Sequence, residues 1–558
     1  MFSRSHYTTH HPSETASQFS LPWMDPPDAC TDEALSGLPG YPTGHEEPSC
    51  DQLRTPILEA IRRVAETRTV SFQTPGHTGG AGLSPELLEY FGENLFRMDV
   101  SVCADIDSLS HPQTFIHEAQ RLYAHAYGVT QSFFLVNGST TGNLAMLVAT
   151  LNAGDKIILP RYVHRSILDA LALSRAIPIW VANEIHPAYQ IPLPLTAAQI
   201  ATALWQHPDA KAVLINTPTY HGLCCNIREI AETVHRTGKL LLVDEAWGAH
   251  LAFHPDYPES AVHHADLCVQ SLHKTLPVSN QGAVLHCNGT RIDIDHLAHV
   301  LTMFQTTSPS YVLLSMMDAA RKEMVQHGQE ILTAVQDLTA IARTQIATVP
   351  GLQCLVPEEL PEYITLDPMK LVIHIDGTRF RMTGYALEEA LCQRFNIQIE
   401  MAGPNYILIL IKPGICQQDL LALVTALHEL HRDSLSLQPH YFSAATTPPN
   451  HWESVLSPAQ AFTTGHYPVH LENSIGCFCW GAVYAYPPGT PVLVPGERIT
   501  HEVVEYLQQL IRLGAQVKGL TEHQEILVCE PQTILPACRP TARRKKRSTY
   551  DSSLFSYR

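Results

Sequence analysis

Short apolar runs alternate with helical stretches between about residues 115 and 290. Helices are predicted at 115–128, 141–151 and 164–174, and strands at 132–136, 156–159, 177–181, 212–216, 239–244 and 266–271. Continuously apolar strands that alternate with helices are typical of a parallel sheet covered on both faces. The pattern therefore predicts a doubly wound, mostly parallel α/β domain. Ligands of such domains bind at the carboxyl ends of the strands.

The pattern changes after residue 310. A long helix is predicted at 315–343, strands at 370–375 and 406–411, helices at 386–395 and 420–430, and a last helix near 501–514. We therefore expect smaller α+β domains C-terminal to the large one. The expected boundaries are a disordered or loosely packed extension at 1–50, an N-terminal segment with the large domain at 51–310, a small α+β domain at 311–445, a C-terminal domain at 446–535 and a basic tail at 536–558.

Composition narrows the range of partners. The 54 acidic and 36 basic residues give a net charge of −18, which argues against nucleic acid as a partner and is weakly compatible with a cationic substrate. The N-terminus has no apolar signal region, and no apolar run is long enough to span a membrane. The 14 cysteines form no paired C-x-x-C motifs, so we expect reduced thiols, no metal site and a cytoplasmic location.

Three local features carry candidate chemistry. The first is 137–143 (NGSTTGN), where glycines and small hydroxylated residues follow a predicted strand and open a helix. Backbone N–H groups and the helix dipole at such a point favour a phosphate. Serine or threonine before a helix is also the ordinary N-cap, so this feature alone is weak evidence.

The other two features are Asp244, which ends the strand 239–244, and Lys274, which follows the strand 266–271. In pyridoxal 5'-phosphate (PLP) enzymes an aspartate pairs with the pyridine nitrogen and a lysine forms a Schiff base with the cofactor aldehyde. Separately, each residue also fits a structural carboxylate or a surface lysine. Together, a phosphate loop, an aspartate and a lysine at the ends of successive strands predict a PLP enzyme.

Longer stretches of the chain resemble the Orn/Lys/Arg decarboxylases, which are fold-type-I PLP enzymes, in the compact form without a receiver-like N-terminal domain. The matching stretches are 72–80, 132–146, 154–166, 216–227, 240–250, 270–277, 305–311 and 486–497. They spread over roughly residues 54 to 530. The resemblance implies decarboxylation of arginine, lysine or ornithine to CO2 and an amine of polyamine metabolism.

The resemblance also implies roles for individual residues. Lys274 would bind the cofactor, Asp244 would pair with the pyridine nitrogen, and Ala246 and His164 would lie on opposite faces of the ring. The phosphate would be surrounded by Ser139, Thr140, Thr141, Ser271 and His273. Thr306 or Thr307 would reach the phosphate of a neighbouring subunit, because active sites of this family lie at the interface of a homodimer. His273 or Lys274 would donate the proton that replaces CO2.

Several points stay open at this stage. The chain departs from the family pattern at Thr78, at Trp247 and in the segment 476–482. The carboxylate for the distal cation of the substrate could be Asp105, Asp107, Glu472 or another residue. Transamination or elimination on the same fold, and a cofactor-binding relative with little turnover, are the alternative functions.

Overall fold

The structure is a computed structural model that describes residues 51–67, 70–103, 106–439, 449, 452–486 and 491–530. The expected extension at 1–50, the basic tail at 536–558 and the candidate Asp105 lie outside the described residues. None of the described helices is long and apolar enough to cross a membrane.

A seven-stranded sheet forms the first half of the fold, with the strand order β1-β8-β7-β6-β4-β2-β3. Its strands are β1 (Gln131–Leu135), β2 (Lys156–Pro160), β3 (Ile177–Val181), β4 (Ala212–Asn216), β6 (Leu240–Asp244), β7 (Leu267–Gln270) and β8 (Ala283–Cys287). Neighbouring strands are parallel except at β8, which is antiparallel to both β1 and β7. The sequence pattern did not predict β8, whose short apolar run is interrupted by His286.

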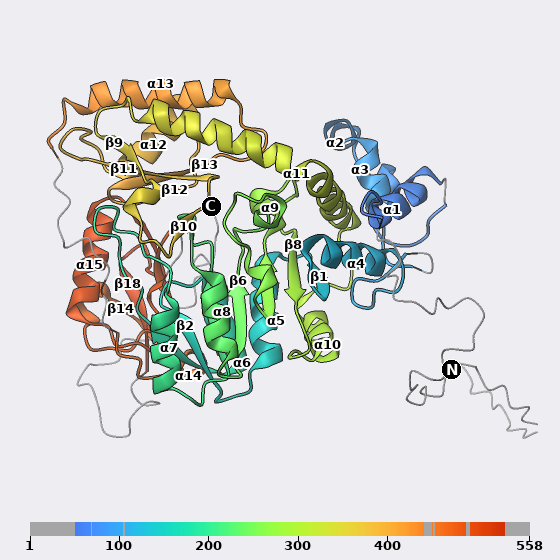
Figure 1. Ribbon diagram of the computed structural model, residues 1–558, viewed down its shortest axis with the longest axis horizontal. Helices are drawn as coiled ribbons and strands as arrows, with labels where there is room; N and C mark the ends of the chain where they lie inside the picture. The colour runs from blue at the N-terminus through green and yellow to red at the C-terminus, as the bar shows by residue number, and fades with distance from the viewer. Residues whose placement is uncertain are drawn as a thin grey trace, which may run out of the picture. The chain divides into compact units, whose positions relative to one another are not determined.

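Helices cover both faces of this sheet (Figure 1). They are α4 (Phe115–Tyr127), α5 (Gly138–Thr150), α6 (Arg165–Ser174), α7 (Ala197–Gln206), α8 (Ile227–His235), α9 (Leu272–Thr275) and α10 (Ile294–Phe304). Side chains alternate between the two faces: Leu241 and Val243 of β6 belong to one buried cluster, and Leu242 belongs to the other. The predicted doubly wound, mostly parallel α/β class is therefore confirmed.

The helix α11 (Tyr311–Ile346) leads from this sheet to a second, antiparallel sheet of order β12-β13-β11-β9 (the small sheet). Its elements are β9 (Leu352–Cys354), β11 (Lys370–Ile375), β12 (Met401–Ala402), β13 (Tyr406–Leu410), α12 (Gly384–Phe395) and α13 (Gln417–Ser434). Short strands β5 (Leu223–Cys224) and β10 (Thr365–Leu366) pair between the two sheets.

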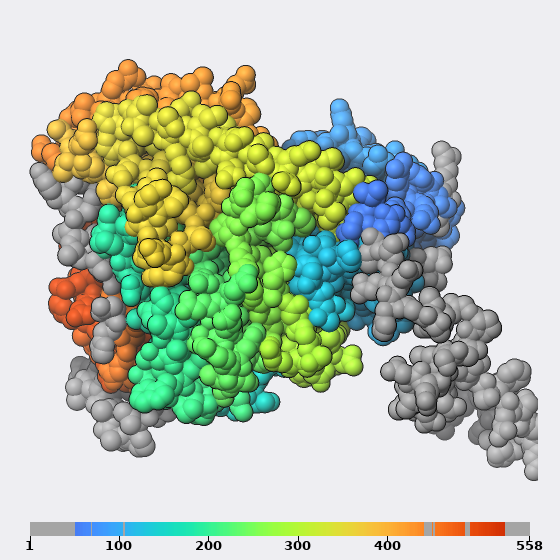
Figure 2. Space-filling view, viewed as in Figure 1, coloured from blue at the N-terminus to red at the C-terminus, as the bar shows by residue number. Residues whose placement is uncertain are grey.

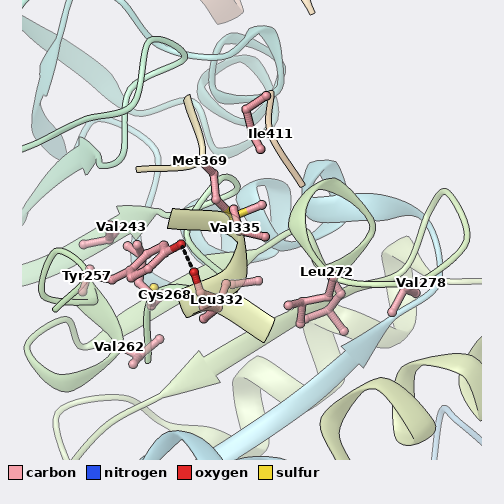
Figure 3. Packing of buried hydrophobic residues seen from close by; sticks show 14 of the residues in the cluster. Val243, Tyr257, Val262, Cys268, Leu272, Val278, Leu332, Val335, Met369 and Ile411 are labelled. Carbon is pink, nitrogen blue, oxygen red and sulfur yellow. Dashed lines mark hydrogen bonds between the residues drawn. The ribbon is translucent and has the colours of Figure 1, made fainter. Parts of the chain in front are cut away.

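One hydrophobic cluster runs from the seven-stranded sheet to the small sheet. Figure 3 shows Val243 of β6, Leu272 of α9, Leu332 of α11 and Met369 beside β11 in this cluster, and the hydroxyl of Tyr257 donates to the backbone oxygen of Leu332 at 3.0 Å. Leu272 lies two positions before Lys274 and Met369 lies directly before Lys370, so the shared core holds the backbone near both lysines.

The last described segment has its own core and two small sheets. Its elements are α14 (Pro458–Thr463), β14 (His466–His470), β15 (Val483–Tyr486), β16 (Pro491–Leu493), α15 (His501–Arg512), β17 (Gln516–Lys518) and β18 (Glu525–Cys529). The atypical segment 476–482 belongs to this core. Cys479 is fully buried there, and the indole N–H of Trp480 donates to Thr464 O at 3.0 Å.

Residues 51–103 form a layer against α11. The helices there are α1 (Pro56–Glu66), α2 (Pro85–Phe91) and α3 (Glu93–Met98), with a short 3-10 helix, η2 (Thr78–Gly80). In Figure 2 the blue surface of this layer meets the yellow-green surface of α11, and Asp318 of α11 accepts a hydrogen bond from Ile57 N at 2.9 Å. The departure at Thr78 lies in η2. The remaining 3-10 helices are η3 (Leu251–Phe253), η4 (Ala261–His263), η5 (Pro357–Glu359) and η7 (Leu471–Asn473).

Candidate active site

The candidate residues converge at one edge of the seven-stranded sheet. The carboxyl ends of β1, β2, β6 and β7 lie at the same edge, because β8 reverses the direction twice between β1 and β7. The sequence continues from these ends into Ser139, His164, Asp244 and Ser271 respectively. The topology therefore brings together residues that are up to 132 positions apart.

The phosphate-loop candidate is the first turn of α5. Ser271 Oγ donates to Ser139 Oγ at 2.8 Å, which joins this turn to the end of β7. A Cβ on Gly142 would lie 2.3 Å from the Val269 side chain, so only glycine lets α5 approach β7 this closely. Thr141 Oγ1 is buried without a hydrogen-bond partner among the described residues, and Thr140 beside it is half-buried. The turn thus holds hydroxyl groups and N–H donors that an anion would satisfy.

Asn143 connects two predicted residues. Its side-chain amide lies 2.9 Å from Asp244 Oδ2 and 2.9 Å from Ser166 Oγ. Ser166 Oγ in turn lies 2.7 Å from His164 Nδ1. The other oxygen of Asp244 accepts a hydrogen bond from Ala246 N at 3.1 Å. The Asp244 carboxylate is therefore held at both oxygens, and a single amide links it to His164.

The electrostatics of His164 suit contact with a flat ring. Burial lowers its pKa, although nearby Asp244 acts in the opposite direction. The imidazole is therefore neutral at physiological pH. Because Nδ1 also accepts a hydrogen bond from Ser166 N at 3.2 Å, the plane of the ring is fixed at the beginning of α6.

Lys274 lies in α9, one turn beyond β7. Burial lowers its pKa, while Asp244 and Glu400 oppose that shift. Its ammonium nitrogen is 4.4 Å from the centroid of the Trp247 ring, and the nitrogen of Lys370 is 3.6 Å from the same centroid. The family departure at Trp247 therefore lies inside the candidate site.

His273 is fixed by the backbone. Its Nδ1 lies 2.9 Å from the carbonyl oxygen of Gly282, so Nδ1 carries a proton and donates it to that oxygen. Burial lowers the pKa of His273, which leaves the ring neutral at physiological pH. A proton for the substrate would then come from Lys274 more readily than from Nε2 of this ring.

Other predicted residues lie away from this cluster. Thr306 and Thr307 are exposed, and the contact found for Thr306 among the described residues is with Ser308. The Asp107 carboxylate accepts four backbone N–H bonds around the beginning of α4, so it has a structural role. Glu472 is exposed in the C-terminal segment, where it bonds Gln508.

Sequence reasoning missed four residues of the site: Asn143, Ser166, Lys370 and Glu400. Asn143 lies in the 137–143 motif but was not assigned a role. Lys370 could have been noticed in the sequence, because it begins a strongly apolar strand. A lysine at such a position must place its charged group inside the fold. Glu400 lies in a loop between α12 and β12, and nothing in its local sequence indicates that it approaches Lys274.

Comparisons with known proteins identify the family of the chain. The model of the major domain of Orn/Lys/Arg decarboxylase matches residues 55–362, and the model of the C-terminal domain matches residues 445–530. An arginine decarboxylase of Halalkalibacterium halodurans is 34% identical over 474 residues, which cover 84% of this chain and 96% of that protein. An arginine decarboxylase of Bacillus subtilis is 33% identical over 471 residues, with the same coverage.

A solved structure shares the fold. The constitutive lysine decarboxylase of Escherichia coli superposes with a TM-score of 0.74 at 21% identity, covering 86% of this chain and 82% of that one. The family matches span both the sheet-edge site and the C-terminal segment. The chain therefore belongs to the Orn/Lys/Arg decarboxylase family and is a decarboxylase of this PLP-dependent family.

Proposed function

We propose that this protein decarboxylates arginine, with PLP bound covalently to Lys274. The observation that carries the proposal is the fixed arrangement of Asp244, Asn143 and His164 at the sheet edge, beside a lysine whose pKa burial lowers. The choice of arginine is supported by relatives named arginine decarboxylase that are 33–34% identical over 84% of this chain.

The donor set of the site fits the phosphate of PLP. Thr141 Oγ1, which is buried and has no partner among the described residues, and the first turn of α5 supply donors, and Ser139, Thr140 and Ser271 lie around them. His273 lies two positions after Ser271 and would complete this end of the site. Phosphate at a helix N-terminus is favoured by the free N–H groups and by the helix dipole.

The same site fits the ring of the cofactor. Asp244, held by Asn143 and Ala246, would keep a proton on the pyridine nitrogen. His164 would lie on one face of the ring as a neutral imidazole, and Ala246 would lie on the other. PLP, when bound, supplies an electron sink for the bond between Cα and the carboxylate. The chain orients the substrate, and Lys274 holds the proton that replaces CO2.

Glu400 is our candidate for the distal cation of the substrate. It lies close enough to Lys274 and Lys370 that its charge affects the pKa of both. Burial raises the pKa of Glu400, and the positive charges of Lys370, Lys274 and Lys412 act against that rise. A carboxylate opposite the reactive lysine is what a basic amino acid requires. A Glu400→Gln variant should raise KM for arginine more than it lowers kcat.

We also propose a homodimer. Residues 70–102 expose several large apolar side chains, among them Val70 (81% exposed), Phe72 (100%) and Tyr90 (83%), and exposed apolar surface is typical of protein–protein interfaces. Exposed Thr306 and Thr307 would then be available to a second copy of the chain. Light scattering of the purified protein should give twice the chain mass, and a double substitution, Phe72→Ser with Tyr90→Ser, should shift it toward one. A cytoplasmic location stays a prediction.

The decisive experiment supplies PLP to the purified protein and measures CO2 with arginine, lysine and ornithine separately. Release of CO2 from arginine alone, or fastest from arginine, would support the proposal. Fastest release from lysine or ornithine would keep the family assignment and overturn the substrate. Formation of a keto acid without CO2 would favour transamination, and a bound cofactor without any product would favour a regulatory relative.

A further inference from the structure

A cavity of about 90 Å³ lies where the seven-stranded sheet, the small sheet and the C-terminal segment meet. Its wall includes Arg161 and Tyr162, which follow β2, together with Tyr406 of β13 and Tyr506 of α15. The volume is large enough for several water molecules or for a small organic ion. All three parts of the fold therefore contribute side chains to one small space.

Arg161 brings unsatisfied hydrogen-bond donors to this cavity. Its side chain is 1% exposed, and its Nη2 donates to Glu497 Oε2 at 2.9 Å and to Val492 O at 3.1 Å. Its Nε and Nη1 are buried and have no partner among the described residues. A guanidinium keeps its proton at physiological pH, and an N–H group that is buried without an acceptor is costly. An acceptor from outside the chain would satisfy these donors.

Aromatic side chains with polar groups form much of the remaining wall. Burial raises the pKa of Tyr506, and Tyr162, Tyr385 and Tyr406 lie close enough to raise it further, so four phenol groups converge here. His221 Nε2 lies 2.9 Å from the hydroxyl oxygen of Tyr406, whereas His221 Nδ1 is buried with no partner in the described part of the chain. Burial lowers the pKa of His221 to about 3, so this ring adds hydrogen-bonding capacity without charge.

Charge selects the kind of molecule that fits. The chain has a net charge of −18, yet the described residues that line this cavity include one arginine and no aspartate or glutamate. A cation would therefore meet Arg161 without a compensating carboxylate in the wall, whereas a carboxylate would receive strong charge-assisted hydrogen bonds. We propose that the cavity is a binding site for a small carboxylate-type oxyanion, such as bicarbonate, which Arg161 and the tyrosine hydroxyls hold.

The cavity borders the candidate active site. Thr219 and Tyr220 line it, and their backbone oxygens accept hydrogen bonds from Lys370 Nζ at 3.4 Å and 2.7 Å. Asn216, which also lines it, is the register partner of Asp244 in the large sheet. A bound oxyanion would thus hold the small sheet and the C-terminal segment against the edge that carries the site. Bicarbonate is a natural candidate, because the CO2 that a decarboxylase releases is hydrated to bicarbonate and a proton.

The test is isothermal titration calorimetry of the PLP-loaded protein, in which the cofactor occupies the phosphate site. Acetate and acetamide, which have nearly the same shape, are titrated separately at constant ionic strength, and bicarbonate is titrated in competition with acetate. The double substitution Arg161→Met with Glu497→Met removes the donors and leaves no buried charge unpaired. Tyr506→Phe removes one hydroxyl. Tyr467→Phe is the matched control, because Tyr467 belongs to the same segment but is not among the residues that line the cavity.

We expect one acetate to bind per chain, acetamide to bind about tenfold more weakly, and bicarbonate to displace acetate. The affinity for acetate should fall by at least about tenfold in the double variant and by a smaller factor in Tyr506→Phe, and Tyr467→Phe should behave like the wild type. Wild-type affinity in the folded double variant would overturn the proposal. So would equal binding of acetate and acetamide to the wild type, or binding of neither, and this comparison needs no variant to fold.

Discussion

The molecule buries cations against indole rings in two regions, and the two regions treat charge differently. In one, the Arg161 guanidinium lies 5.5 Å from the ring centroid of Trp180 and 4.9 Å from that of Trp452, and it pairs with Glu497 at 2.9 Å. Both charged side chains are 1% exposed. This region joins the end of β2 to the C-terminal segment through one neutralised pair.

In the other region, the side-chain nitrogens of Lys274 and Lys370 both lie near the ring of Trp247. No ion pair to either lysine occurs among the described residues, although Asp244, Asp367 and Glu400 are close enough to affect their pKa values. Opposite charges that are buried together serve to hold segments in place. Burial lowers the pKa of both lysines, and groups with such perturbed pKa values concentrate at functional sites.

The largest expected effect is a loss of activity that follows substitution of Lys274 but not of Arg161. A Lys274→Ala variant should fold, lose the visible absorption of bound PLP and lose decarboxylation by more than about 1000-fold, because it removes both the covalent attachment and a proton donor. Arg161→Lys, assayed in parallel, should keep the absorption band. Normal turnover in Lys274→Ala would refute the assignment of the catalytic lysine.

The next largest effect is a loss of stability when the buried ion pair of Arg161 and Glu497 is broken. Glu497→Ala leaves the buried Arg161 charge unpaired, so the free energy of unfolding in urea should fall by about 3–5 kcal/mol. A double substitution to methionine at both positions should recover much of that loss. Glu472→Gln, at an exposed carboxylate, should change stability by less than about 0.5 kcal/mol. Equal stability of Glu497→Ala and the wild type would show that the pair has no structural role.

Sequence patterns predicted the strands whose apolar runs are continuous, and failed where a polar side chain finds a distant partner. β6 and β7 were predicted because every central residue is apolar. β8 was missed because His286 interrupts it. In the structure His286 bonds Ser132 at 2.8 Å and Gln270 at 3.2 Å, and these contacts across the sheet have no local signal.

The same distinction holds in the site. The positions of Asp244 and Lys274 at the sheet edge were predictable, because Asp244 ends a buried strand and Lys274 follows one, where the topology places ligands. The role of Asn143 depends on a hydrogen bond to a residue 101 positions away, and that of Lys370 on backbone oxygens about 150 positions away. Asp107 shows the opposite error: a carboxylate considered for substrate binding accepts its hydrogen bonds from the backbone around the beginning of α4.

Glu245 makes the stability of the fold depend on pH. It follows Asp244 in the sequence but is buried away from the two lysines. Its carboxyl group accepts bonds from Ser260, Ala261 and Gln270, and burial raises its pKa from 4.5 to about 7. The folded state therefore binds the proton more tightly than the unfolded state. The free energy of unfolding should fall as pH rises from about 4.5 to about 7, by up to about 3 kcal/mol.

Glu245→Gln should remove this component, so its stability should depend less on pH over that interval. Urea midpoints measured at half-unit steps between pH 4.5 and 8 would reveal the difference. Parallel curves for the variant and the wild type would mean that Glu245 is ionised throughout. In that case the hydrogen bonds to Glu245, which lower its pKa, would outweigh burial, which raises it.

The smallest expected effect tests whether Asp244 is positioned rather than merely present. Asn143→Ala removes the amide that bonds Asp244 and Ser166, so kcat/KM and the affinity for PLP should each fall by about 10- to 100-fold, the loss expected for one hydrogen bond to a charged group. Ser166→Ala breaks only the branch to His164 and should cost less. If the two variants were equally impaired, the amide would act through His164, and the carboxylate of Asp244 would need no support beyond the backbone of Ala246.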